Sequence, residues 1–138
     1  MADEAIIVEL LGKNGKGDPV RYTCADATAI PKGTLLVLET PRAVVPHAAV
    51  DTPFVGIAAE EKTALDGLTS ISVYTNGIFR LTLKTGGTPA TIGDGVSLAS
   101  DANTVELSTS KDNEKGWEVG YAMEDIAAAT IGAIKIRK

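Results

Sequence analysis

Hydrophobic and polar residues alternate with a period of two along much of the chain, as in strands that bury one face. The pattern is clearest in residues 70–75 (SISVYT), where Ile71 and Val73 lie on one side, and again in residues 78–84 (IFRLTLK). No segment keeps a helical period over ten or more residues. The patterning therefore predicts a mainly β domain of about nine short strands.

The expected strands are separated by turns rich in glycine and proline. They cover residues 20–24, 34–39, 54–60, 70–75, 78–84, 96–99, 104–107, 117–123 and 131–137. Pro41 and Pro46 bracket residues 42–45, so we expect an edge or a loop there. Asn76 and Gly77 tolerate positive φ, which predicts a tight hairpin or a bulge between two of these strands.

The N-terminal segment differs from the rest of the chain. Residues 5–11 (AIIVELL) are apolar and fit a strand or one short helix, and residues 12–19 contain three glycines and a proline. Such a sequence has high backbone entropy and indicates a joint. We therefore divide the chain into an N-terminal arm with a glycine-rich hinge (1–19) and a β-domain (20–138).

The β-domain repeats itself along the sequence. The matching segments are IPKGTLLVLE (30–39) with IGDGVSLASD (92–101), and FVGIAAEE (54–61) with EVGYAMED (118–125). The offset is 62 residues for the first pair and 64 for the second. We therefore expect two related β-units, at about residues 30–75 and 92–137, in a compact β-barrel or β-sandwich-like (β-tulip-type) domain with an internal pseudo-repeat and an extended N-terminal arm.

Three glycines and one aromatic residue are predicted to have structural roles. Gly56 and Gly120 lie in the middle of the echoing strands, where glycine permits a bulge or a close backbone approach, and Gly77 belongs to the expected turn. Trp117 is the one tryptophan in a chain with 4% aromatic residues, so we expect it to anchor the core or a subunit interface.

Composition narrows the class of protein. The length of 138 residues fits one domain, and the net charge of −5 argues against a direct nucleic-acid partner. No apolar run reaches the roughly 20 residues of a membrane span, and Asp3 and Glu4 stand where a signal peptide would be basic. A single cysteine, Cys24, favours a reducing compartment such as the cytoplasm.

No motif predicts catalysis or metal binding. His47 is the only histidine and is expected in an exposed loop, and the segment GKNGKGD lacks the hydroxyl residue of a phosphate-binding loop. We therefore expect no enzyme and no catalytic, cofactor-binding or metal-binding residues. The alternative is a small-ligand or carbohydrate-binding β-module, whose candidate acids are Asp51, Glu60, Glu61 and Asp66.

An ordered set of segments carries a resemblance to a known family. YTCADATAIPKGTLLVL, FVGIAAEE, ISVYTNGIFRL, IGDGVSLASD and EVGYAMED with the later IKI resemble the phage capsid decoration, or cement, proteins in the broad class of the lambda head decoration protein. The similarity covers residues 20–138. Some relatives carry a recombinase-like label, but this chain lacks the phosphate-binding loop that such an activity requires.

The resemblance implies a structural virion protein without a cofactor. Such a protein is made in the host cytoplasm, binds the outer surface of an assembled capsid as a homotrimer, and has the major capsid protein as its partner. It implies contact between the N-terminal arm and the capsid, for which the candidate residues are Ile6, Ile7, Val8, Leu10 and Leu11. Another virion attachment protein, such as a head-fibre component, is a further alternative.

Overall fold

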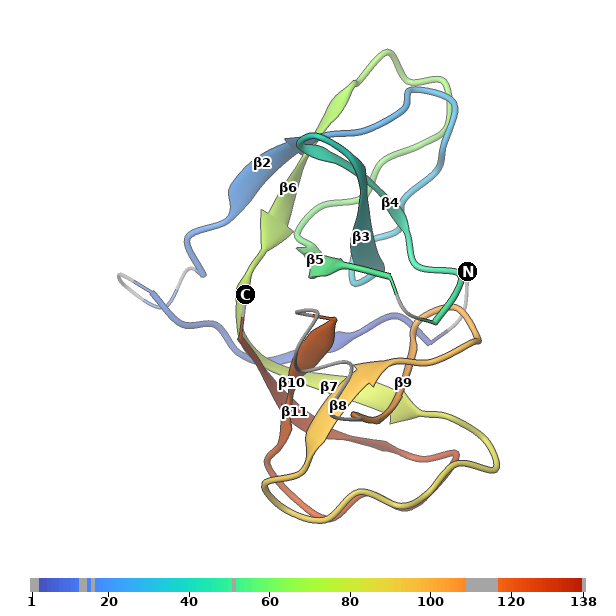
Figure 1. The fold of residues 1–138 in the computed structure, drawn as a ribbon. Helices are drawn as coiled ribbons and strands as arrows, with labels where there is room; N and C mark the ends of the chain where they lie inside the picture. The colour runs from blue at the N-terminus through green and yellow to red at the C-terminus, as the bar shows by residue number, and fades with distance from the viewer. Residues whose placement is uncertain (1–2, 13–14, 16, 51, 109–116, 138) are drawn as a thin grey trace.

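A computed structural model describes residues 3–12, 15, 17–50, 52–108 and 117–137, which contain eleven strands and no α-helix. The strands form two barrels, which lie one above the other in Figure 1. The prediction of a mainly β, barrel-like fold is confirmed by this architecture.

The first barrel is a closed ring of five strands in the order β2-β4-β3-β5-β6. Its strands are β2 (Val20–Thr23), β3 (Leu35–Thr40), β4 (Ala43–Pro46), β5 (Phe54–Ala58) and β6 (Ser70–Tyr74). The β2–β4 pair is parallel, and the other neighbours are antiparallel. Closure of the ring gives each of these strands two partner strands, with β2 and β4 meeting only at Thr23 and Ala43.

The second barrel repeats this arrangement. Its strands are β7 (Asn76–Leu83), β8 (Gly95–Leu98), β9 (Thr104–Leu107), β10 (Glu118–Ala122) and β11 (Ile131–Arg137). They run in the order β7-β11-β10-β8-β9, and a parallel β7–β9 pairing closes the ring. Each strand therefore has a counterpart five places earlier in the chain, with the same partners in the same directions.

Two buried clusters form the hydrophobic core. The smaller one lies within the first barrel and includes Leu36, Val44 and Ile71. The larger one fills the second barrel and continues into the first barrel through side chains such as Leu35 and Ile57. The two barrels therefore share one continuous apolar contact, which explains why β5 is buried along its whole length.

Some expectations for local structure were wrong. The hairpin at Asn76 and Gly77 does not form, because β6 pairs with β2 and β5 whereas β7 pairs with β1, β9 and β11. The chain instead passes directly from one barrel into the other there. Residues 43–46 form β4 inside the first ring and not a loop, and His47 is buried and not exposed.

Candidate functional site

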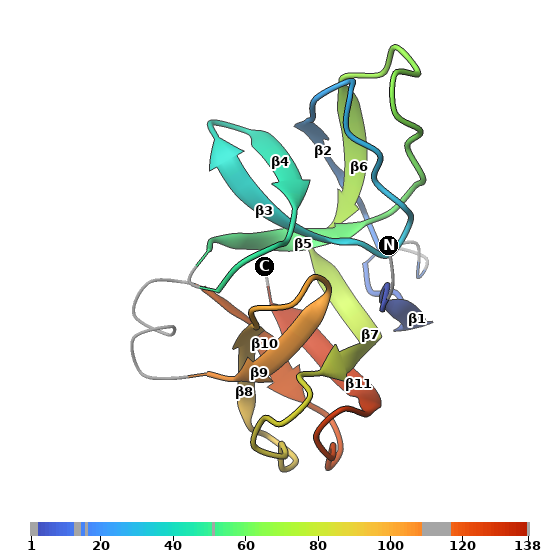
Figure 2. The same ribbon diagram turned by 90° about the vertical axis from the view of Figure 1, so that its right-hand side faces the viewer.

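The predicted capsid-contact arm contains a strand, β1 (Ile6–Glu9), which lies outside both rings. It pairs antiparallel with β7, with Ile6 opposite Arg80 and Ile7 opposite Phe79. Figure 2 shows β1 beside β7, in the region where the two barrels meet. Of the eleven described strands, β1 alone has a single partner strand, so its second edge is open.

The residues just before β1 contact the first barrel. The backbone N–H of Ala5 donates to the carbonyl oxygen of Gly33 at 2.8 Å. A Cβ placed on Gly33 would lie 2.6 Å from the oxygen of Ala5, so this turn leaves no room for a side chain.

The equivalent turn of the second barrel contains Gly93 and not Gly95, so the predicted match of residues 30–39 with 92–101 was wrong by two residues. Gly93 has a similar φ of +89° but nothing within 4 Å. Of these two equivalent turns, only the one in the first barrel therefore contacts the arm.

The candidate arm residues divide into an outer and an inner group. Ile6 and Val8 are 54% and 50% exposed, and Ile7 is less so. Leu10 and Leu11 are half-buried, and Leu10 packs against the larger core cluster. The arm thus has an apolar outer face beside its open backbone edge, while its far end is attached to the body.

An apolar hollow of about 260 Å³ lies between β1 and the two barrels. Its lining includes Ile7 and part of the half-exposed Ile6 from the arm, Ile57 and Tyr74 from the first barrel, and Phe79 from the second. The rings of Tyr74 and Phe79 are 5.9 Å apart at an angle of 40°. The arm therefore covers an apolar surface to which both barrels contribute.

The segment from β1 to β2 contains several left-handed backbone conformations. Gly12, Gly15 and Gly17 have φ values of +100°, +66° and +80°, and Asp18 has φ +41°. A Cβ on Gly17 would lie 2.9 Å from the Tyr74 ring. The return of the chain from the second barrel to β2 therefore depends on conformations that favour glycine.

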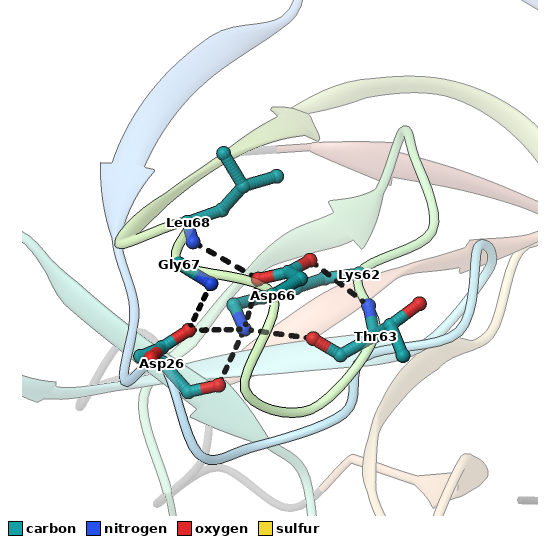
Figure 3. Close-up of polar contacts among 6 residues, drawn as sticks. All are labelled: Asp26, Lys62, Thr63, Asp66, Gly67 and Leu68. Atoms are coloured by element: carbon teal, nitrogen blue, oxygen red, sulfur yellow. Dashed lines mark hydrogen bonds and ion pairs between the residues drawn. The ribbon is translucent and has the colours of Figure 1, made fainter.

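A buried lysine lies near one end of the first barrel (Figure 3). The Lys62 ammonium donates to the carbonyl oxygens of Asp26 at 2.7 Å and Thr63 at 3.2 Å, and to the Asp66 carboxylate at 3.1 Å. The Asp66 carboxylate also accepts the Leu68 backbone N–H at 2.9 Å. This last bond is the main cause that lowers the pKa of Asp66, and Lys62 lowers it further.

This arrangement satisfies the ammonium group with acceptors from three residues. It therefore closes the end of the barrel and leaves Lys62 no role as a nucleophile or base. Lys62 forms a bridge with Ile30, and the equivalent bridge in the second barrel joins Ala90 to Ile126. The same structural position thus holds a charged residue in one barrel and an apolar residue in the other.

The acids proposed for a small-ligand site do not gather in one pocket. Glu60 accepts the Ser72 backbone N–H at 3.1 Å, while Asp66 belongs to the Lys62 cluster. Glu61 is exposed, and Asp51 lies outside the described residues. Glu124, the counterpart of Glu60 in the second echo, makes the equivalent bond to the Ala133 N–H at 3.0 Å. The glutamate at the seventh position of each echo thus joins one strand to the next.

His47 links the two barrels, which the sequence did not indicate. Its Nε2 lies 2.7 Å from the oxygen of Ala99, and its Nδ1 accepts the Asn103 N–H at 3.2 Å. These partners select the neutral ring with the proton on Nε2. The Asn103 Oδ1 in turn accepts the Leu35 N–H at 3.0 Å. Burial lowers the pKa of His47, partly offset by the backbone bonds to Ala99 and Ala49.

The glycines singled out in the sequence lie at close backbone contacts. A Cβ on Gly56 would be 2.3 Å from the oxygen of Tyr74, and one on Gly120 would be 2.0 Å from that of Lys135. Gly77 has φ +133° and lies near the oxygen of Glu9 in the arm. Trp117 is half-buried and directly precedes β10.

The described residues contain no group of three or more His, Cys, Asp or Glu side chains placed to hold a metal ion. Within the same part of the chain there is no helix of the length and apolarity that crossing a membrane requires.

Comparisons with known proteins point to phage particles. A sequence model described as phage cement protein matches residues 15–137. Among solved structures, the head fiber gp8.5 N base of bacteriophage phi29 is similar, with a TM-score of 0.56 and 18% identity over 86% of this chain and 94% of that chain. A search of curated proteins found no match. At this identity the structural likeness shows a shared fold.

Proposed function

Because this chain belongs to the phage cement protein family, and so is a capsid-associated structural protein of a phage, we propose that it binds the outer surface of the assembled capsid and stabilises the shell. The observation that carries the proposal is the family match, which spans both barrels. The partner is the major capsid protein, and the bound form is a homotrimer located in the virion.

The contact with the capsid is assigned to the arm. Ile6 and Val8 combine exposed apolar side chains with an open strand edge, and a strand edge is a ready template for pairing with another chain. Each barrel strand has two partner strands whereas β1 has one, so β1 is the strand of the described molecule with a whole backbone edge to offer.

Co-sedimentation with empty, expanded capsids of the same virus tests the proposal. The full chain is expected to sediment with the shells in numbers that match their three-fold positions. Ile6→Asp/Val8→Asp should weaken binding at least about tenfold, because two buried charges oppose an apolar contact. The matched control is Leu65→Asp/Leu68→Asp, which changes two apolar residues that are 76% and 52% exposed in a loop of the first barrel. Absence of the full chain from the shell fraction would refute shell binding, and equal loss in both variants would refute the role of the arm.

A head-fibre attachment protein is the second candidate, favoured by the fold shared with the phi29 head fiber base. The number of chains per virion separates the two functions. A cement protein occupies positions throughout the lattice, whereas a fibre base is present only where fibres stand. Quantitative mass spectrometry of purified virions measures this number against the major capsid protein.

A further inference from the structure

β1 belongs to neither closed ring, yet it is docked on the body by contacts to both barrels. We propose that β1 is exchanged between copies of this chain, so that the β1 of one copy occupies the position beside β7 of a neighbouring copy. This inference concerns the free protein and does not depend on the proposed binding to capsids.

The position beside β7 requires a strand. Without β1, Ile78, Phe79 and Arg80 would lose their partners along this edge, and the hollow formed with Ile57 and Tyr74 would lose its cover. Exposed apolar surface next to an unpaired strand edge favours association with any matching strand. The matching strand of a second copy offers the same contacts as the chain's own β1.

The linker favours release of β1 from its own body. When β1 is docked on its own chain, the linker holds left-handed conformations at Gly12, Gly15, Gly17 and Asp18. For the non-glycine Asp18, such a backbone conformation is strained. An extended linker does not need these conformations, while every contact of β1 is regained on the neighbour. Exchange thus relieves backbone strain without loss of pairing.

The linker is also long enough to reach another copy. Residues 10–19 separate β1 from β2, and at roughly 3.3–3.6 Å per extended residue they span about 33–36 Å. In dilute solution the chain's own β1 has the advantage of a high effective concentration. Copies held side by side remove this advantage, so exchange should increase with protein concentration. If each copy donates β1 to the next, a cyclic trimer closes without free ends.

Mixed cysteine variants test the exchange directly. One protein carries Ile6→Cys and a second carries Arg80→Cys, the two positions being paired partners. A disulfide between positions 6 and 80 in the mixture then requires β1 of one copy to lie on β7 of another. The native Cys24 is buried and stays in place. The linked species is identified by mass spectrometry after oxidation at low and high protein concentration.

The control uses a pair inside one barrel. Ile131 and Thr82 are also paired partners, and their strands, β11 and β7, belong to the same closed ring. A mixture of Ile131→Cys and Thr82→Cys should give at least about tenfold less linked dimer than the mixture for positions 6 and 80, because ring strands have no hinge through which to exchange. A second arm pair, Glu9→Cys with Ile78→Cys, guards against a local effect of one substitution.

The double variant Ile6→Cys/Arg80→Cys completes the experiment. It should form the disulfide within one chain when dilute and between chains when concentrated. The proposal is overturned if the double variant links only within single chains at every concentration, if it does not link at all, or if the control mixture links as readily as the arm mixture. None of these outcomes bears on capsid binding, which is measured with shells.

Discussion

The His47 imidazole is a neutral link between the barrels, with its Nε2 proton directed to one carbonyl oxygen and its Nδ1 facing the Asn103 N–H. Protonation of Nδ1 would place two donors against each other, so the folded state favours the neutral ring. The pKa of His47 is accordingly lowered from its ordinary 6.5, and burial is the leading cause.

Stability should therefore fall on mild acidification. A histidine with a lowered folded pKa contributes stability that is present above 6.5 and is lost as the pH falls through the folded value. We expect the free energy of unfolding in urea to decrease between about pH 7.5 and about pH 5. In His47→Gln this decrease should be smaller, although the variant should be about 1–3 kcal/mol less stable at the higher pH because a buried link is altered.

The carboxylate with a lowered pKa does not obscure this measurement. The pKa of Asp66 is below its ordinary 3.8, so its contribution to stability is present above that value and is lost only at more acidic pH. An equal pH dependence in the native chain and in His47→Gln would show that another group causes the loss.

At the residue scale, the burial of two polar side chains, His47 and Lys62, was not predicted from the sequence. His47 was expected in an exposed loop, but it is buried, and Asn103, whose N–H donates to it, is 56 residues away in the chain. Lys62, which no motif singled out, is also buried, and its acceptor Asp26 is 36 residues away. Such contacts follow from the fold and not from neighbouring residues. One signal was available for Lys62, because extending the echo by one residue aligns it with the apolar Ile126.

At the element scale, Gly33 and Gly93 allow a matched test of how β1 is held. Both lie in equivalent turns with φ near +90°, so alanine imposes the same backbone strain at each. Only at Gly33 does the added Cβ meet the arm, at the oxygen of Ala5. Gly33→Ala should therefore speed amide hydrogen exchange in residues 6–9 by at least about tenfold relative to Gly93→Ala.

The same pair supplies its own control. Gly33→Ala should change amide exchange in the strands of the first barrel about as much as Gly93→Ala changes it in the strands of the second barrel, because the two turns are equivalent. Equal exchange of residues 6–9 in both variants would mean that the contact of Ala5 with the first barrel does not hold the arm.

Strands with clear alternation could be predicted, and their connections could not. In β7, Phe79, Leu81 and Leu83 are buried as the pattern indicated. By contrast, β4 was missed because of its flanking prolines, although Pro46 occupies the last position of the strand, opposite Leu36. Three of the five pairings in each ring join strands that are not consecutive, which in the first ring are β2–β4, β3–β5 and β2–β6, so no local pattern shows them.

At the scale of the whole molecule, the echo between residues 54–61 and 118–125 reflects two rings with the same pairing order. The predicted units began at about residues 30 and 92, whereas the rings begin with β2 at Val20 and β7 at Asn76. The difference arises because β2 and β7 have a similar alternation of apolar and polar residues but few identical residues. The sequence also did not show that the rings pack together, since this depends on which face of β3 and β5 each side chain takes.

Leu35 and Leu36 distinguish packing between the barrels from packing within one. They are adjacent and fully buried, but Leu35 belongs to the cluster shared by both barrels and Leu36 to the cluster of the first barrel. Either alanine substitution should lower stability by about 2–5 kcal/mol. Two probes can follow unfolding: Trp117 fluorescence, which reports on the second barrel, and far-ultraviolet circular dichroism, which reports on both. The two unfolding transitions should coincide for the native chain and for Leu36→Ala. For Leu35→Ala, the fluorescence transition should occur at a higher denaturant concentration than the circular dichroism transition. The reason is that the first barrel unfolds first and the second barrel then unfolds separately. Coincident transitions in both variants would show that cooperativity does not depend on this shared core.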